Sequence, residues 1–440
     1  MYNNRRIWSV TYPILLGLLA QNIINVTDTA FLGRLGEIPL GASAMGGLLY
    51  YCIVTIAFGF SIGTQILIGR RNGESQYDAI GSLFWQGLYF SFVMSWIFLA
   101  LMGNTSDTLL RLFISTDEVY VATIEFFDVR MWGILFSTLG FMFRAFYVGI
   151  TQTRILTMSA VVMAVVNIVL DYAMIFGHWG FPAMGITGAA WASVIAEAVS
   201  LLFYILYTYF YVDKVKYGLS KIVHIRWEVI GQILRISMFT MLQYFLLMSV
   251  WFIFFIAIEK HGSFSLAVSN IIRSLYAVVM IPIHALSTTA NTLVSNLIGE
   301  GKTKEVLPLL HKITKNSVFT MCLIIAVFAF FPRQIIGVYT DDIALIEGSV
   351  SSLYVLLGAM FIASISNIYF NGISGTGAAR AALYIEIIIQ AIYGMYIVWI
   401  GMWLMMPLEI CFTTELLYYI LMLVLSIIYL RRGSWRNKQI

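Results

Sequence analysis

An internal repeat runs through most of this 440-residue chain. The segments 36–74 and 262–300 align without a gap, so that Gly36 matches Gly262 and Glu74 matches Glu300. A second match follows at nearly the same offset, where Thr116-Asp117 corresponds to Thr340-Asp341. Because similar sequences adopt similar structures, we expect two related helical bundles rather than one continuous core. Bundles repeated in this way are common among membrane transporters.

The composition places both copies in lipid. The chain is 60% hydrophobic and only 11% charged, and its mean hydropathy is +0.87, whereas a soluble domain carries about 25% charged residues. Apolar stretches such as 53–68, 318–331 and 381–406 are long enough to cross a bilayer as helices. We therefore predict an all-α integral membrane protein with twelve transmembrane helices in two pseudo-symmetric six-helix bundles.

The distribution of basic residues supports an even number of spans. We predict spans at 9–32, 40–68, 80–102, 126–148, 157–177, 185–211, 230–257, 265–297, 316–332, 349–371, 381–404 and 408–430. With both termini cytoplasmic, most Lys and Arg residues fall on inside segments, as the positive-inside rule requires. We therefore expect a multi-pass protein of the cell inner (plasma) membrane. Its N-terminal lobe is predicted at 1–212, a basic cytoplasmic linker at 213–228 and its C-terminal lobe at 229–440.

Motifs for enzymatic or metal chemistry are not evident. Cys52, Cys322 and Cys411 are far apart and lack the spacing of metal ligands. The glycine-rich run 372–377 has no Lys-Ser/Thr pair and follows no strand, so it does not resemble a phosphate-binding loop. The net charge of +4 reflects the loops and does not indicate nucleic-acid binding. We expect neither enzymatic activity, nor a cofactor, nor a nucleic-acid partner.

Two predicted spans carry polar residues at helical spacing. Gln21, Asn25 and Asp28 in the first span are four and three residues apart, which places them on one helix face. Asn167 and Asp171 in the fifth span are four apart and also share a face. Ionisable groups at mid-depth in a membrane are costly and are usually functional. The alternative is a satisfied pair of interior polar groups.

The two aspartates belong to the first repeat alone. At the offset that aligns Gly36 with Gly262, Asp28 corresponds to Phe254 in the second copy. Two carboxylates close together in an apolar environment cannot both be ionised cheaply. We therefore expect the pair to hold a proton or a Na⁺ ion, with oxygens of Asn167 and Ser193 in support. The sequence leaves the choice between H⁺ and Na⁺ open.

Other deep polar residues allow two interpretations. Glu197 and Glu386 are predicted either to be functional or to be paired with a neighbouring helix. Gln243 in the seventh span is a further candidate for lining the site. Arg144 and Arg273 lie in apolar segments, where each is expected to pair with a carboxylate or to extend to an interface.

Several motifs resemble the MATE (multidrug and toxic compound extrusion) family. They are NVTDTAFLGRLG in the first span, IGRRNGE after the second, NIVLDY in the fifth and MGITGAAWASVIAE before and within the sixth. The resemblance implies a V-shaped pair of six-helix bundles that export amphipathic, often cationic, compounds in exchange for H⁺ or Na⁺. It assigns the cation site to Asp28, Asn167, Asp171 and Ser193, as in the DinF-like branch. The NorM-like branch has carboxylates on spans seven and ten, where this chain offers Gln243 and Gly375.

We therefore expect a cation-coupled antiporter that works by alternating access, with a small amphipathic substrate bound in a cleft between the lobes. Membrane lipid is the other expected partner, and nothing in the sequence requires more than a monomer. One alternative is a flippase for lipid-linked oligosaccharide or lipid II, but such proteins tend to have a basic cavity that is not apparent here. A more distant alternative is an intramembrane aspartyl enzyme, in which the two carboxyl groups would have to meet face to face. The sequence does not identify the substrate.

Overall fold

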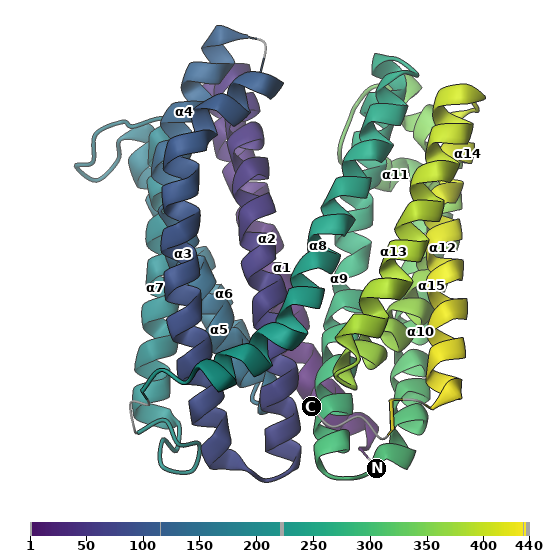
Figure 1. The fold of residues 1–440 in the computed structure, drawn as a ribbon. Coiled ribbons are helices and arrows are strands. Elements are labelled where there is room, and N and C mark those ends of the chain that lie inside the picture. The colour runs from purple at the N-terminus through teal and green to yellow at the C-terminus, as the bar shows by residue number, and fades with distance from the viewer. Residues whose placement is uncertain (1, 115, 221–223, 434, 437–440) are drawn as a thin grey trace. The chain divides into compact units, whose positions relative to one another are not determined.

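Two helices of equal length carry the internal repeat (Figure 1). In the computed structural model, α2 spans Glu37–Gly73 and α9 spans Ser263–Gly299, each with 37 residues. The residues before them, Gly36 and Gly262, have φ angles of 125° and 91°, which favour glycine because a side chain there would be strained. The matching sequences thus begin and end their helices at matching positions.

The structure describes residues 2–114, 116–220, 224–433 and 435–436, and within these ranges it contains helices but no strands. The remaining helices are α1 (Asn4–Leu35), α3 (Tyr77–Phe113), α4 (Asp117–Arg130), α5 (Gly133–Gly149), α6 (Arg154–Phe176), α7 (Ile186–Tyr211), α8 (Trp227–Glu259), η1 (Thr303–Glu305), α10 (Val306–Phe330), α11 (Pro332–Ile336), α12 (Ile343–Gly375), α13 (Ala379–Ile397), η2 (Val398–Trp403), α14 (Leu408–Cys411) and α15 (Thr413–Arg432).

The predicted class of an all-α membrane protein is confirmed. Within the described ranges, eleven helices are long and apolar enough to cross a membrane, and the bent pair α4 and α5 can supply a twelfth span. That pair corrects the prediction of one continuous helix at 126–148, because the chain bends by 47° between Arg130 and Gly133. At the offset that aligns Thr116 with Thr340, the equivalent residues of the second repeat are Tyr354 and Leu357, which lie within the unbroken helix α12.

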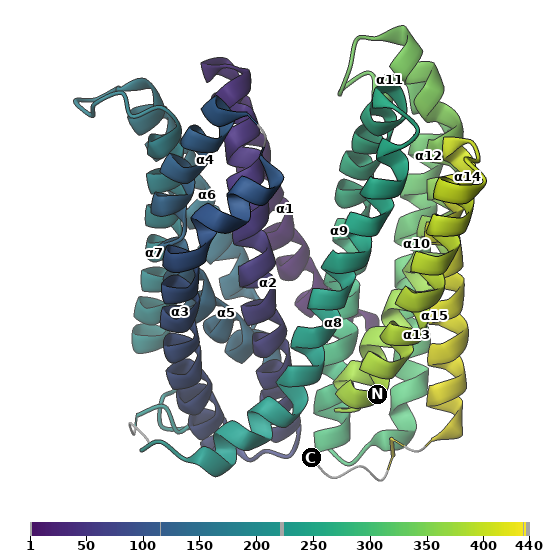
Figure 2. The ribbon, with the colours of Figure 1, turned by 45° about the horizontal axis from the view of Figure 1, so that its top comes forward.

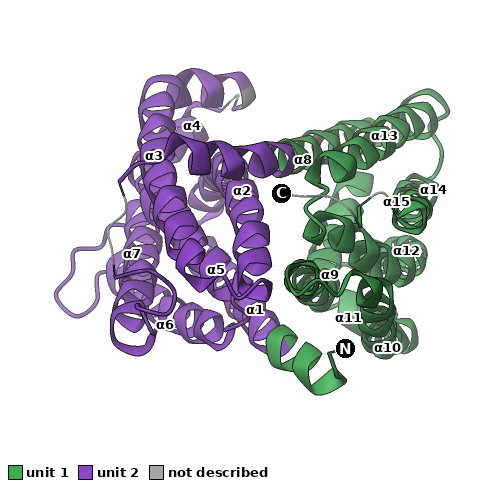
Figure 3. Ribbon diagram, turned by 60° about the horizontal axis from the view of Figure 1, so that its bottom comes forward, with its two compact units in different colours: residues 1–11, 242–440 green, residues 12–241 purple. Residues whose placement is uncertain are grey.

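Contacts divide the chain into two compact units (Figure 3). Unit 1 comprises Met1–Thr11 and Leu242–Ile440, and unit 2 comprises Tyr12–Met241. Early residues of α1 belong to unit 1 because Thr11 is hydrogen-bonded to Thr289 of α9 at 2.9 Å. The boundaries of these units reflect contacts between helices and not the sequence repeat. The predicted lobes at 1–212 and 229–440 therefore stay a prediction.

The linker expected at 213–228 is only partly described. Residues 214–220 form turns, and 221–223 lie outside the described residues. Helix α8 begins at Trp227, two residues before the expected start of the C-terminal lobe. Its first part packs on α2 within unit 2, where the Ser237 hydroxyl donates to the carbonyl of Phe60 at 2.9 Å.

Packing within each unit determines which helices can share a site. In unit 2, α6 packs along α7, and α2 contacts both α4 and α5. In unit 1, α12 packs against α9, α10 and α15 (Figures 1 and 2). Each unit thus has interior positions at which residues distant in the sequence meet.

Candidate functional site

Helices α1 and α6 run in the same direction through unit 2 and touch at two levels. Near the start of each, the Thr157 hydroxyl donates a hydrogen bond to the Pro13 carbonyl at 2.8 Å. Near their ends, the rings of Phe31 and Phe176 meet edge to face with centroids 5.8 Å apart. These contacts establish the register between the two helices.

This register brings Asp28 and Asp171 to the same level. Asp28 follows Pro13 by about four helical turns, and Asp171 follows Thr157 by nearly the same rise. The two carboxyl groups are close enough to share a hydrogen bond when one of them carries a proton. Asp171 is fully buried, and neither of its carboxyl oxygens has a hydrogen-bond partner among the described residues. The same holds for Oδ1 of Asp28.

Apolar residues cover the aspartate pair on one side. Leu32 and Ile175 lie four residues after Asp28 and Asp171, one helical turn further along, and belong to a buried cluster. The other buried members of this cluster are Phe126 of α4, Ala42 of α2, and Ile186, Ala189 and Ala190 of α7. Apolar side chains thus cover the pair toward the C-terminal ends of α1 and α6.

Asn167 lies one turn from Asp171 on the opposite side from that cluster. It is 1% exposed, and neither its amide nitrogen nor its amide oxygen has a hydrogen-bond partner among the described residues. Buried polar groups are nearly always hydrogen-bonded, so unpaired ones require an explanation such as an absent ion or water. Asp28, Asp171 and Asn167 together present oxygens suited to a proton or a monovalent cation.

Ser193 is level with Asn167 rather than with the aspartates. The hydroxyls of Ser159 and Ser200 are hydrogen-bonded at 2.7 Å, which aligns α6 with the antiparallel α7. Ser193 precedes Ser200 by seven residues, and Asn167 follows Ser159 by eight. Ser193 is half-buried, and its hydroxyl does not reach the unpaired oxygens of Asp171. Its role as a supporting ligand stays a prediction.

The other polar residues predicted for the site do not join the aspartate pair. Gln21 and Asn25 are exposed on α1, and no hydrogen bond links either of them to Asp28 or Asp171 in the described part of the chain. Gln243 is buried on α8 in unit 1, with an unpaired Nε2 atom. Of the three α1 residues, Asp28 is the one whose side chain lies within hydrogen-bonding range of Asp171.

Glu197 is paired with a neighbouring helix, which was one of its two predicted roles, and its partner is Arg130, which was not among the predicted residues. Arg130, the last residue of α4, donates two hydrogen bonds to the Glu197 carboxylate, at 2.6 and 3.0 Å. The Arg130 guanidinium also lies 3.5 Å from the centre of the Tyr50 ring, and the Tyr50 hydroxyl donates to Glu197 at 3.0 Å. This ion pair lies within electrostatic range of Asp28. The repeat carries a signal for this residue, since Arg130 corresponds to the uncharged Tyr354 at the offset that aligns Thr116 with Thr340.

The bend between α4 and α5 makes room for this ion pair. Gly133 begins α5, and a Cβ atom there would collide with Nη1 of Arg130 and Oε2 of Glu197. The absence of a side chain lets the Arg130 guanidinium lie against the start of α5. Glycine also weakens helical continuity at this point. The break in the span and the ion pair therefore depend on the same residue.

Unit 1 contains two further buried carboxylates with different partners. Arg273 pairs with Glu415 at 3.1 Å, which confirms the prediction of a carboxylate partner for Arg273, although Glu415 was not among the predicted residues. Glu386 is 3% exposed and accepts hydrogen bonds from Gln390 at 2.7 Å and from the Tyr418 hydroxyl at 2.9 Å. Both donors to Glu386 are neutral.

A resident metal site is not apparent in the described ranges, since no group of three or more His, Cys, Asp or Glu side chains is placed to hold a metal ion. The aspartate pair with Asn167 has fewer ligands than such a site. This donor set suits a weakly held cation that binds and leaves. The guanidinium of Arg144 lies 5.1 Å from the centre of the Phe58 ring.

Comparison with known proteins identifies a family. The MatE family model matches residues 13–173 and 239–400. A probable multidrug resistance protein NorM from Thermotoga maritima is 24% identical over 84% of this chain and 79% of its own length. A protein of the same description from Synechocystis sp. is 25% identical over 77% of this chain and 73% of its own length.

Solved structures show the same fold. A Vibrio cholerae MATE transporter, solved as a mutant, matches 99% of this chain and 98% of its own with a TM-score of 0.88 and 16% identity. A transporter of the MOP superfamily from Pyrococcus furiosus matches 98% of this chain and 96% of its own with a TM-score of 0.86 and 18% identity. At these identities the likeness establishes the fold alone.

Proposed function

Because the chain belongs to the MatE family of membrane transporters, and is thus not an enzyme, we propose that it exports amphipathic, often cationic, compounds in exchange for H⁺ or Na⁺. The names of the NorM relatives support a multidrug substrate range. Asp28 and Asp171 bind the coupling ion, and Asn167 and Ser193 supply further oxygens. The protein lies in the inner membrane with both termini cytoplasmic.

The observation that carries this proposal is the unbalanced charge of the aspartate pair. Asp28 and Asp171 face each other at one level of unit 2, and the nearby Arg130 is already neutralised by Glu197. Two like charges about 4 Å apart repel by about 4 kcal/mol at an effective dielectric constant of 20. Binding one proton or one Na⁺ ion removes most of that repulsion.

This energy is sufficient to drive a conformational equilibrium. Shifting a two-state equilibrium from 1:99 to 99:1 requires about 5.5 kcal/mol, so a change of about 4 kcal/mol moves it most of the way. In the proposed cycle, ion entry from outside draws α1 and α6 together at the level of the two aspartates. The accompanying change in unit 2 weakens substrate binding and favours outward release. Loss of the ion to the cytoplasm resets the pair.

Reconstituted vesicles test this function directly. We expect ethidium efflux when either a pH gradient or a Na⁺ gradient is imposed separately, and we expect Asp28→Asn and Asp171→Asn to reduce it to background. Asp341→Asn, in an exposed loop, is the matched control and should transport normally. Unimpaired efflux by both site variants would disprove the assignment. If neither gradient drives transport, the flippase function becomes the better hypothesis.

Substitution of Asn167 can distinguish H⁺ from Na⁺ as the coupling ion. An amide oxygen coordinates Na⁺ but is not needed to hold a proton between two carboxyl groups. If Na⁺ is the coupling ion, Asn167→Leu should raise the half-saturating Na⁺ concentration by about tenfold or more, the usual cost of a lost ligand. If H⁺ is the coupling ion, the same variant should leave the pH dependence of efflux nearly unchanged.

A further inference from the structure

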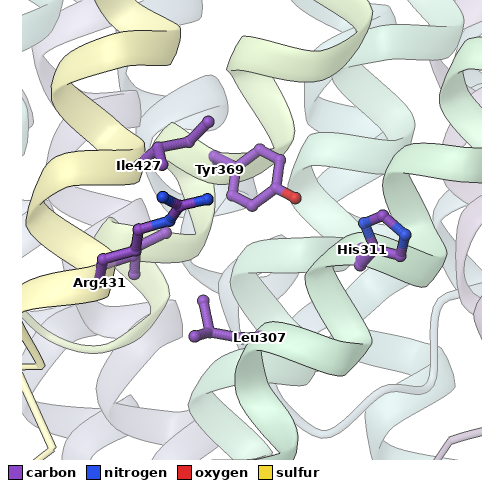
Figure 4. A pocket seen from close by; sticks show the side chains of 6 residues that line it. Leu307, His311, Tyr369, Ile427 and Arg431 are labelled. Atoms are coloured by element: carbon purple, nitrogen blue, oxygen red, sulfur yellow. The ribbon is translucent and has the colours of Figure 1, made fainter.

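A pocket of about 230 Å³ lies between α10, α12 and α15 in unit 1 (Figure 4). Its lining combines polar and aliphatic side chains: Leu307, His311, Tyr369, Ile427, Leu430 and Arg431. Figure 4 shows the Arg431 guanidinium beside the Tyr369 ring and the His311 imidazole on the opposite side of the space. The pocket is smaller than the roughly 300–1,000 Å³ typical of sites for drug-sized ligands.

The pocket lies at one end of the bundle. Leu307 is in the first turn of α10, Arg431 is in the last turn of α15, and Tyr369 is six residues before the end of α12. Basic residues gather at this end of unit 1, on η1, on α10 and next to Arg431: Lys304, Lys312, Lys315 and Arg432. By the positive-inside rule this end faces the cytoplasmic leaflet, where anionic headgroups are concentrated.

The positive charge in the pocket is available to an anion. In the part of the chain that the structure describes, no acidic side chain forms an ion pair with Arg431 or His311. A guanidinium binds phosphate through two parallel hydrogen bonds. The Tyr369 hydroxyl and the His311 imidazole each offer an additional donor.

The helix faces that line the pocket become apolar toward the middle of the membrane, on α10 after Lys315, which lies one turn beyond His311. Phe319 follows His311 on α10 by eight residues, and Val424 precedes Arg431 on α15 by seven, so each pair shares a helix face. Phe319 is 65% exposed and Val424 is 47% exposed. A ligand with an anionic head and apolar chains would match this arrangement over its whole length.

We propose that the pocket binds the phosphate of an anionic phospholipid from the cytoplasmic leaflet. Arg431 forms the charge-assisted hydrogen bonds, Tyr369 and His311 donate to the remaining phosphate oxygens, and the acyl chains follow the exposed faces of α10 and α15. Such a lipid would join α10 to α15 across α12. The site is separate from the aspartate pair, which lies in unit 2.

Native mass spectrometry of the purified full-length protein tests this site. Phosphatidylglycerol and phosphatidylcholine are titrated in a mild detergent against wild type, Arg431→Gln and Arg432→Gln. Arg432 is a matched control because it is the adjacent arginine, carries the same charge and does not line the pocket. We expect Arg431→Gln to weaken phosphatidylglycerol binding by about tenfold or more, as for loss of a hydrogen bond between charged groups. Arg432→Gln should bind as wild type.

Each other result contradicts the proposal. An equal loss of phosphatidylglycerol binding in Arg431→Gln and Arg432→Gln would indicate general attraction of the lipid to a basic surface. Equal binding of phosphatidylglycerol and phosphatidylcholine would show that the site does not recognise the net charge of the lipid. Displacement of phosphatidylglycerol by inorganic phosphate at comparable concentration would identify free phosphate as the ligand. Tyr369→Phe provides a second, milder variant should Arg431→Gln fail to fold, and it should also weaken binding.

Discussion

Arg130 and Glu197 form an ion pair that joins the end of α4 to the middle of α7, with two hydrogen bonds of 2.6 and 3.0 Å. The pair lies near the aspartate site but is itself neutral. The deep carboxylates fall into two classes, those with an arginine partner and those without one among the described residues. Glu197 and Glu415 have an arginine partner. The carboxylates for which no arginine partner is found in the described ranges are Asp28, Asp171 and Glu386.

Removing Arg130 should destabilise unit 2 strongly. Arg130→Gln leaves the Glu197 carboxylate, whose side chain is 14% exposed, without its cation, and breaking a buried pair in this way costs roughly 3 kcal/mol. The double variant Arg130→Gln/Glu197→Gln removes both charges and should recover most of the loss. Thermal unfolding midpoints in detergent, compared between the single and double variants, provide the double-mutant cycle. A double variant no more stable than Arg130→Gln would contradict this account.

A methyl group at Gly133 should displace the same ion pair. Gly133→Ala places a Cβ atom against Arg130 and Glu197, and overpacking of this kind costs about 1–3 kcal/mol. Gly140 lies on the same helix with no atom within 4 Å of an added Cβ, so Gly140→Ala should be neutral or slightly stabilising. Equal changes of the thermal midpoint in Gly133→Ala and Gly140→Ala would contradict a steric role for Gly133.

The two buried carboxylates of unit 1 should respond differently to neutral substitution. Glu386→Gln keeps an oxygen that accepts from Gln390 and Tyr418, so the expected loss is below about 1 kcal/mol. Glu415→Gln removes the carboxylate that balances the charge of Arg273 and should cost roughly 3 kcal/mol. Unfolding midpoints of the two variants provide the comparison. The opposite ranking would show that Glu386 balances a charge.

The link between Tyr2 and Glu300 should depend on pH. Partial burial acts to raise the pKa of Glu300, but hydrogen bonds from Lys302 and Tyr2, at 2.7 and 2.6 Å, outweigh it and lower that pKa. A lowered folded-state pKa contributes stability above the unfolded value of about 4.3, and this stability is lost as the pH falls through the folded-state pKa.

Tyr2→Phe should therefore lower the thermal midpoint slightly at pH 7, because the carboxylate is partly exposed. The difference from wild type should shrink as the pH is lowered below about 4. Midpoints recorded from pH 7 to pH 3.5 test the sign. A difference that is constant or grows toward acid would contradict it.

Much of the fold could be predicted from local sequence. Apolar runs of helical length require helices in lipid, since the backbone must satisfy its hydrogen bonds internally. The gapless match of 36–74 with 262–300 predicted equivalent helices, and α2 and α9 have the same length. The candidate carboxylates were recognisable because charged residues are rare in such segments. Their part in ion coupling stays a prediction.

The sequence by itself determined the helical class, the repeat and the identity of the polar residues placed in the membrane, because these follow from hydropathy and spacing along the chain. Only the tertiary structure decided which charges are balanced. Arg130 and Glu197 are far apart in the sequence, as are Arg273 and Glu415, so these pairs depend on how the helices rotate and pack. The bend after Arg130 depends likewise on contacts between α4, α5 and α7. Charge pairing across helices is a property of packing, and no single segment of the chain encodes it.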